Sequence, residues 1–479
     1  MMNTIMAHEA GKLARNTALQ IAGKAIGILL GLATVAVLFR YLQETGFGEF
    51  TTAITYLSIF AVIVDFGLTL TTVQMISEPG ADEPKILGNI FSLRILSGLV
   101  VFTLAPVIAL LFPYSPIIKL AIAVGSMAYF FSSTSQMLGG VFQKRLEMWR
   151  VVLAELVGRI ILLVGSVFVA LTASSMIGVI LAIVIGNFAQ LAITLLLARP
   201  FVRIKPTIDL AVWKAILVRS WPIGISIIFN VVYLRGDILF LSFFRGDAEI
   251  GFYGAAYKII DTLTAIPVLF MGLILPMLVA AWSDHNKERF AQLMQRSFDF
   301  FVLLGLPIAV GAYAVATPLM VLFGGERFAP SGAILQVLAP TIFIVFVGAL
   351  YGHAIVGIRK QKPMAFGYAV TAVISILAYL YFVPRFGGIG AAWVTFISEA
   401  LLMIITYVVV VRTSGATPRF TVFWKSAAAC VVMFVTLSAT SDMQVLLRVA
   451  LGALAYGAAA IAFKATSLRD IRHLFLKRV

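Results

Sequence analysis

The chain has 479 residues, of which 61% are hydrophobic and 12% are charged, and its mean hydropathy is +1.03. A soluble protein of this length needs far more charge on its surface, so the composition excludes a soluble globular fold. The formal net charge of +15 indicates an anionic partner, such as nucleic acid or a lipid surface.

Apolar runs of about 20 residues recur from Ile21 to Phe463, and each is long enough to cross a ~30 Å hydrocarbon core as a helix. About 14 such runs can be placed, and they leave no stretch long enough for a soluble domain. The sequence therefore predicts an all-α polytopic membrane protein. No small-residue cleavage site follows the first run, so we expect the polar N-terminal segment to be a surface helix that leads into the first span.

Lysine and arginine residues are distributed unevenly between the two sets of loops. About 25 lie in the set that includes both chain ends, and about six lie in the other set. This asymmetry predicts that both termini face the cytoplasm and that the number of spans is even. The net positive charge is then mainly a topology signal, with anionic phospholipid headgroups as a contact surface and no nucleic acid as a partner.

Two distant segments of the chain are alike. Arg40–Ala53 and Arg245–Ala256 both carry a Gly-x-aromatic-x-x-Ala pattern just after a short outside loop, which indicates an internal duplication with parallel repeats. The linker between the repeats has the apolar and basic residues of an amphipathic interfacial helix. The expected organisation is an N-lobe of six spans (1–198), an interfacial linker (199–220), a C-lobe of six spans (221–411), and two further spans with a basic tail (412–479).

Small residues and prolines mark special places in the spans. Gly23, Gly27 and Gly31 share one face of the first span, which allows close helix packing or a helix that slides or bends. Prolines interrupt spans of the second repeat and permit kinks, namely Pro222, Pro267, Pro276, Pro307 and Pro318.

Motifs for cofactors and metals are missing from the sequence. The single cysteine, Cys430, lies in a predicted span, and the four histidines are too scattered for a zinc motif. No Gly-x-x-x-x-Gly-Lys-Ser/Thr loop occurs for nucleotide phosphates. We therefore expect no cofactor, no metal and no ATP hydrolysis by that route.

Charged residues of both signs fall within the predicted spans. A charge at the middle of a bilayer costs ~3 kcal/mol on insertion scales, so such residues normally face a partner or an aqueous cavity. The basic ones are Lys24, Arg94, Arg159, Arg235 and Lys258, and the acidic ones are Asp65, Glu155, Asp237, Asp261 and Glu399.

Two interpretations of these charges stay open. The balance of signs favours structural ion pairs. Alternatively, the cations line a hydrated central cavity and attract an anionic substrate, since arginine can donate two hydrogen bonds to a phosphate, while the carboxylates hold the cations in place. On the second interpretation the candidate substrate-binding residues are Arg235, Lys258, Asp237, Asp261, Asn230, Tyr257, Lys24, Asp65, Arg94 and Arg159.

Several motifs together resemble a known family. The first repeat contains Ala14–Thr17, Leu38–Leu42, Gly46–Phe50 and Asp65–Leu68. The second contains Arg235–Leu239 and Gly251–Ala256, and Gly387–Ala392 with Glu399 follows in a late span. This pattern resembles the polysaccharide transporter, or oligosaccharide flippase, family of the multidrug/oligosaccharidyl-lipid/polysaccharide (MOP) exporter superfamily, over essentially the whole chain.

The resemblance implies two six-helix lobes around a central cavity, with two peripheral helices. It implies a transporter and not an enzyme, located in the bacterial cytoplasmic (inner) membrane, which moves an undecaprenyl-diphosphate-linked glycan across by alternating access. Polysaccharide polymerase and assembly proteins are then expected partners. Relatives that handle the peptidoglycan precursor are expected to cluster arginines in the first two spans. The first lobe here offers only Lys24, Arg94 and Arg159, so a general oligosaccharide flippase is preferred.

Two alternatives stay open. A multidrug or cation antiporter of the same superfamily would use Asp65, Asp237 and Asp261 to bind a cationic drug. A membrane polysaccharide polymerase or ligase would need a sizeable outside loop with catalytic residues, and no predicted outside loop exceeds about ten residues.

The predicted topology can be tested by reporter fusions or cysteine labelling. We expect the outside loops near Gln43, Ser115, Ser174, Gly246, Gly325, Phe386 and Ser441 to be labelled from outside in intact cells. Cysteines at Lys144 or Lys362 should stay protected, because basic loops remain in the cytoplasm. Labelling of either one from outside would show that the topology is wrong.

Overall fold

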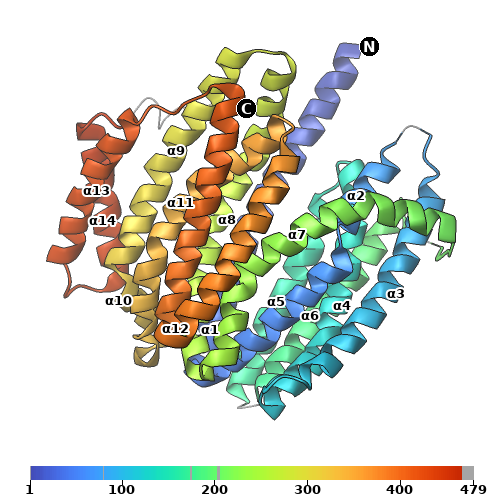
Figure 1. Ribbon diagram of the computed structural model, residues 1–479, viewed down its shortest axis with the longest axis horizontal. Coiled ribbons are helices and arrows are strands. Elements are labelled where there is room, and N and C mark those ends of the chain that lie inside the picture. The colour runs from blue at the N-terminus through green and yellow to red at the C-terminus, as the bar shows by residue number, and fades with distance from the viewer. Residues whose placement is uncertain (1, 79, 173–174, 202–204, 467–479) are drawn as a thin grey trace. The chain divides into compact units, whose positions relative to one another are not determined.

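The computed structural model describes residues 2–78, 80–172, 175–201 and 205–466, and it is built from helices joined by short turns (Figure 1). Among these residues it contains no strand, so the predicted all-α class is confirmed. The side chains of residues 2–18 and of a few other helical positions, Asn230 among them, lie outside the described part.

The chain divides into two compact units, Met1–Arg235 (unit 1) and Gly236–Val479 (unit 2). The boundary falls within α7 (Leu210–Phe244). The other helices of unit 1 are α1 (Met2–Asp65), α2 (Leu68–Ile76), α3 (Glu83–Ala109), α4 (Pro116–Lys144), α5 (Trp149–Leu171) and α6 (Met176–Ala198). Those of unit 2 are α8 (Asp247–Ser283), α9 (Lys287–Ala314), α10 (Ala316–Gly324), a 3-10 turn (Glu326–Phe328), α11 (Ser331–Gly357), α12 (Gln361–Ser414), α13 (Thr421–Ala439) and α14 (Val445–Ala462).

Eleven helical segments among the described residues are long and apolar enough to cross a membrane. Two of them, Ala22–Ile76 and Pro363–Ser414, have 55 and 52 residues, which is enough for two crossings each. They bend at Gln43 and Gly387, whose φ angles are 58° and 56°. If the bent segments are counted twice and α7 is added, the count reaches the predicted number of about 14 spans.

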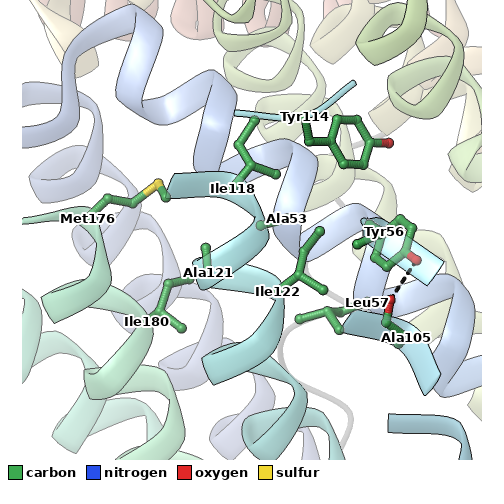
Figure 2. Close-up of a cluster of buried hydrophobic side chains, with 11 residues drawn as sticks. Ala53, Tyr56, Leu57, Ala105, Tyr114, Ile118, Ala121, Ile122, Met176 and Ile180 are labelled. Carbon is green, nitrogen blue, oxygen red and sulfur yellow. Dashed lines mark hydrogen bonds between the residues drawn. The ribbon is translucent and has the colours of Figure 1, made fainter. Parts of the chain in front are cut away.

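Unit 1 is held together by the packing of α4 against α1, α3 and α6, and of α5 against α1 and α6. Figure 2 shows one of its buried clusters, in which Leu57, Ile122 and Ile180 meet from α1, α4 and α6. The Tyr56 hydroxyl donates to the Ala105 carbonyl at 2.8 Å and so joins α1 to α3. Burial of such aliphatic side chains stabilises a helix bundle by close packing, because lipid itself is as apolar as the core.

The glycine face of α1 packs against α5. A Cβ at Gly23 would collide with the Val152 side chain, and a Cβ at Gly27 would lie 3.4 Å from Arg159 Nε. A Cβ at Gly23 would therefore force the Val152 side chain to move, while Gly27 and Gly31 lie in ordinary contact with Arg159, so the structure supports the packing interpretation of the glycine face.

In unit 2, α11 is the central helix and packs against α8, α9 and α12. The peripheral helices α13 and α14 pack on each other and on α9 (Figure 1). The Tyr456 hydroxyl of α14 lies 2.9 Å from the Leu303 carbonyl and 2.8 Å from the Ser426 hydroxyl. These hydrogen bonds tie α14 to α9 and α13 within the apolar region.

The helix α7 begins at Leu210 and continues into the seventh predicted span, so the second half of the expected interfacial linker is part of that span. Its Ile216 is fully buried against unit 1 residues such as Leu68 and Leu87. The apolar face of this segment therefore packs on protein.

The start of α7 is also fixed to α3 by polar contacts. Asn89 Oδ1 accepts from the Asp209 backbone N–H at 2.7 Å, and Lys85 Nζ lies 2.9 Å from Asp209 Oδ2. The hydrogen bond from Lys85, followed by that from the Val212 N–H, holds the pKa of Asp209 below its usual value. Both hydrogen bonds favour the charged carboxylate of Asp209. Their contribution to the stability of the fold is therefore present at neutral pH and is lost as the pH falls through the lowered pKa of Asp209.

Candidate functional site

The charged residues that the sequence places inside the membrane fall into three environments. Some are buried and hydrogen-bonded, some are exposed on their helices, and some lie between these extremes. These environments distinguish the charges that hold the fold from the charges that remain accessible.

Asp65, which is partly exposed, and Arg94 form an ion pair where α1 ends. Arg94 is completely buried, and its Nη2 lies 2.6 Å from Asp65 Oδ1. The same guanidinium donates to the Val64 carbonyl at 2.9 Å and to the Thr69 hydroxyl at 3.0 Å. We call this group the Arg94 clamp.

The position of the Arg94 clamp has a clear physical cause. Phe66 and Gly67 adopt left-handed φ angles of 38° and 76°, so the helix breaks between α1 and α2. A break leaves carbonyls without their helical partners, and an unpaired carbonyl is costly in an apolar environment. Arg94 supplies the missing donor to Val64 and at the same time neutralises Asp65. The structure therefore brings these two predicted site residues together as a clamp on a broken span.

Lys24 and Arg159 have a different environment. Both side chains are exposed, on α1 and α5. Arg159 Nη1 donates to the Gly27 carbonyl at 3.2 Å, and the guanidinium also lies near the Cα of Gly31, where an added Cβ would be 3.5 Å away. Because the glycines have no side chains, the Arg159 side chain can contact the backbone of α1 directly. Part of its guanidinium group stays exposed.

Asp237 is the most deeply buried carboxylate of the predicted set, with an exposed fraction of 0%. Its Oδ2 accepts from the Tyr253 hydroxyl at 2.6 Å, and its Oδ1 accepts from the Ile238 N–H at 2.7 Å. The Thr395 hydroxyl lies 3.0 Å from the Tyr253 hydroxyl and 3.3 Å from the Tyr379 hydroxyl. This network, the Asp237 network, joins α7, α8 and α12 inside unit 2.

The Tyr253 ring is completely buried, so it is not accessible for stacking on a ligand. Tyr257, one helical turn further along α8, is also buried, with 6% exposed, and its ring centroid lies 5.8 Å from that of Tyr253. Sequence reasoning missed Thr395 and Tyr379, because single hydroxyl residues in an apolar span give no signal until the helices are packed.

The remaining candidates lie on α7 and α8. Arg235 and Asp261 are half-buried, and Lys258 is exposed. Asn230 belongs to α7, but its side chain falls outside the described residues. Lys258 and Asp261 are three residues apart on one helix, so they share a face as predicted by their spacing.

Unit 2 also contains an apolar groove beside the peripheral helices. A cavity of about 250 Å³ is lined by Leu306 and Val310 of α9 and by Ala427, Cys430, Val431 and Phe434 of α13. A second cavity of about 350 Å³ shares Leu306 and Val310 and extends over α11 and α12 to Phe343 and Phe396. We call the two together the α9 groove. Its lining is almost entirely carbon, which suits a hydrocarbon chain and not a polar ligand.

These features define the class of protein: an all-α, multi-pass membrane protein in which charged groups are held inside a helical bundle. Residues 13–282, more than half of the chain, match the family described as polysaccharide biosynthesis protein, and the chain belongs to this family.

Two curated proteins are similar in sequence. ExoT of Rhizobium meliloti, named a succinoglycan biosynthesis transport protein, is 21% identical over 419 residues, which cover 82% of this chain and 81% of ExoT. Agl15 of Haloferax volcanii, named a probable low-salt glycan biosynthesis flippase, is 22% identical over 181 residues, which cover 37% of this chain and only 38% of Agl15.

Solved structures share the fold. The lipid II flippase MurJ in an inward closed conformation superposes with a TM-score of 0.79 at 15% identity, over 95% of this chain and 99% of the MurJ chain. An inward-facing multidrug resistance MATE family transporter of the MOP superfamily gives a TM-score of 0.66 at 13% identity, over 81% and 95% of the two chains. The chain therefore shares the fold of these two proteins, and the family resemblance seen in the sequence is confirmed by the family match.

The Arg94 clamp makes a prediction about stability. Arg94→Gln should destabilise the protein by ~3 kcal/mol, because it removes the charged partner of Asp65 and the donor to the Val64 carbonyl. Arg159→Gln is the matched control and should cost ~1 kcal/mol or less, because that side chain is exposed and makes one described hydrogen bond. Thermal unfolding in detergent measures both. Equal stability of the Arg94→Gln and wild-type proteins would show that the clamp has no structural role.

Proposed function

We propose that this protein is a flippase that moves an undecaprenyl-diphosphate-linked oligosaccharide across the bacterial cytoplasmic membrane for the synthesis of a surface polysaccharide. The observation that carries the proposal is membership of the polysaccharide biosynthesis family over more than half of the chain. The transport and flippase names of the two relatives and the MOP fold support the same conclusion.

The chemistry of the chain suits the parts of such a substrate. A polyprenyl diphosphate carries a long hydrocarbon chain, two phosphates and a polar glycan. In our proposal the α9 groove takes part of the hydrocarbon chain, since it is apolar and lies on membrane-spanning helices. The phosphates need cations, and arginine suits them because its planar fork can donate two hydrogen bonds at once.

Among the predicted site residues, Arg235 and Lys258 are the proposed contacts for the diphosphate or for an acidic sugar. Lys24 and Arg159 are further candidates, because their exposed side chains can reach a ligand without breaking a buried ion pair. Asp237 and Asp261 are proposed to hold the cations in place.

The proposed setting follows from the same assignment. Both termini face the cytoplasm, the protein acts as a secondary transporter without an enzymatic step, and polymerase or assembly proteins take over the translocated unit. Anionic phospholipid headgroups contact the basic loops.

Deletion of the gene tests the function. We expect loss of one surface polysaccharide, with its lipid-linked repeat unit left in the inner leaflet, because synthesis of the unit continues while translocation stops. Polysaccharide composition and the leaflet of the lipid-linked unit are measured. A deletion strain without a paralogue that makes normal polysaccharide and becomes sensitive to dyes would instead support the multidrug antiporter.

The cation site is tested by complementing the deletion strain with Arg235→Lys. This change keeps the charge but loses bidentate geometry, so export should fall at normal protein abundance. Arg385→Lys is the matched control, because the Arg385 guanidinium donates to its own helix at Tyr381 and stacks on that ring. If Arg235→Lys is silent and the double change Arg235→Gln with Asp237→Asn also exports normally, the site assignment is wrong.

A further inference from the structure

The bend of α12 is stabilised from outside the helix. At Gly387 the backbone has φ 56° and ψ −135°, so the helix is interrupted there. An interruption leaves carbonyls before the bend and N–H groups after it without helical partners. In this chain these groups find their partners on the turn between α7 and α8.

Two charged residues of that turn serve the two sides of the bend. Arg245, directly after α7, donates from Nε to the Val383 carbonyl at 3.2 Å and from Nη2 to the Pro384 carbonyl at 2.9 Å. Glu249, in the first turn of α8, accepts from the Gly388 N–H at 2.8 Å through Oε1. The two side chains also face each other, with 3.8 Å between Arg245 Nε and Glu249 Oε2.

Each charge has the sign that its helix end requires. Carbonyls at a helix C-terminus carry a partial negative charge, which the guanidinium complements, and N–H groups at an N-terminus carry a partial positive charge, which the carboxylate complements. A Cβ at position 387 would collide with the Glu249 carboxylate, so the bend needs glycine both for its φ angle and for this contact. The contact is therefore specific to this pair of elements.

A bend that serves only as a fixed turn can be capped by a serine, threonine or aspartate of its own chain segment. Here the caps belong to a different hairpin, which couples the α7–α8 turn to the bend of α12. Both charged side chains remain about one-third exposed, at 30% and 35%, so water can replace the partners when the two elements separate.

We propose that Arg245 and Glu249 form a latch that holds the α7–α8 turn on the bend of α12 and must open during each transport cycle. The role of this latch in transport rests on the proposed function. The same Arg-x-x-x-Glu-x-Gly-Phe spacing occurs at Arg40, Glu44, Gly46 and Phe47 in unit 1, which places an arginine and a glutamate at the equivalent turn of the first repeat.

The capping contact is tested by amide hydrogen exchange on the full-length protein in detergent. Glu249→Ala should accelerate exchange at Gly388 and the next amides of α12 by roughly tenfold, because their acceptor is lost. Glu249→Gln should give an intermediate effect, since its amide oxygen can still accept. Arg385→Gln is the matched control and should leave these amides unchanged. Equal exchange in Glu249→Ala and wild type would overturn the proposal.

The opening step is tested with a reversible covalent latch. Glu249→Cys and Gly388→Cys are combined in a Cys430→Ser background, because a Cβ at Gly388 would lie 3.8 Å from Glu249 Cγ, within reach of a disulfide. Oxidation should reduce export in intact cells at least about tenfold, and a reductant should restore it, since a closed disulfide prevents separation. The single-cysteine proteins should not respond to oxidant.

The outcomes separate the latch from the function. Unchanged export by the fully oxidised double-cysteine protein shows that the elements need not separate and overturns the latch, while the flippase assignment stands. A deletion strain with normal polysaccharide overturns the flippase assignment, while the hydrogen-exchange comparison still decides whether Glu249 caps α12.

Discussion

Inside a hydrocarbon core every backbone N–H and carbonyl must find a partner within the protein, because no water is there to supply one. Continuous helices meet this requirement by themselves, but this chain interrupts its spans at several points. At the break after Asp65, Arg94 donates to the Val64 carbonyl. At the bend of α12, Arg245 and Glu249 serve the two helix ends. Charged residues are thus placed where helices stop. The break after Asp65 falls within a predicted span, so the backbone carbonyl that Arg94 satisfies offsets part of its cost in the membrane, whereas the bend of α12 falls at a predicted outside loop.

This constraint divides the intramembrane charges into those that are engaged in holding the fold and those that are available to bind a substrate. Arg94 is fully buried with three described hydrogen-bond acceptors around it, so recruiting it to a substrate would expose both Asp65 and the helix break. Both oxygens of Asp237 are likewise engaged. Lys24, Arg159 and Lys258 keep exposed side chains. A cation that must bind and release an anion repeatedly is better placed among the exposed set, because each exchange then replaces water and not a buried ion pair.

Much of the fold could be predicted from the sequence, for physical reasons. Long apolar runs have few alternatives to membrane helices, and the motifs at Gly46–Phe50 and Gly251–Ala256 indicate the superfamily. The bends at Gln43 and Gly387 fall at the loops predicted near Gln43 and Phe386, but the break at Phe66 and Gly67 was not predicted. Prolines are the usual signal, yet α8 continues through Pro267 and Pro276 and α9 through Pro307. Interruptions with left-handed backbone lie at Gln43, at Phe66 with Gly67, and at Gly387, and a further one separates α9 from α10 at Val315, three residues before Pro318. The partners of Arg94 and Asp237 also depend on how helices pack, which spacing along one helix does not reveal.

Four helix ends on the predicted cytoplasmic side share the same kind of cap. The helices α4, α8, α11 and α14 are followed by residues with positive φ, namely Leu146, His285, Arg359 and Lys464. In each case the next N–H bonds back to a carbonyl five residues earlier, as from Glu147 to Phe142, which is the pattern of a Schellman cap.

Glycine is the usual residue at that position of a Schellman cap, and none of these four ends has it. A non-glycine residue costs ~1–2 kcal/mol there. Three of the four carry a basic side chain, which interacts favourably with the helix C-terminus by ~0.3–1 kcal/mol and, when charged, with anionic lipid headgroups by about 1 kcal/mol more. On a membrane surface a charge at these positions therefore offsets the backbone strain, and two of the residues on which the topology prediction rests, Arg359 and Lys464, also end helices.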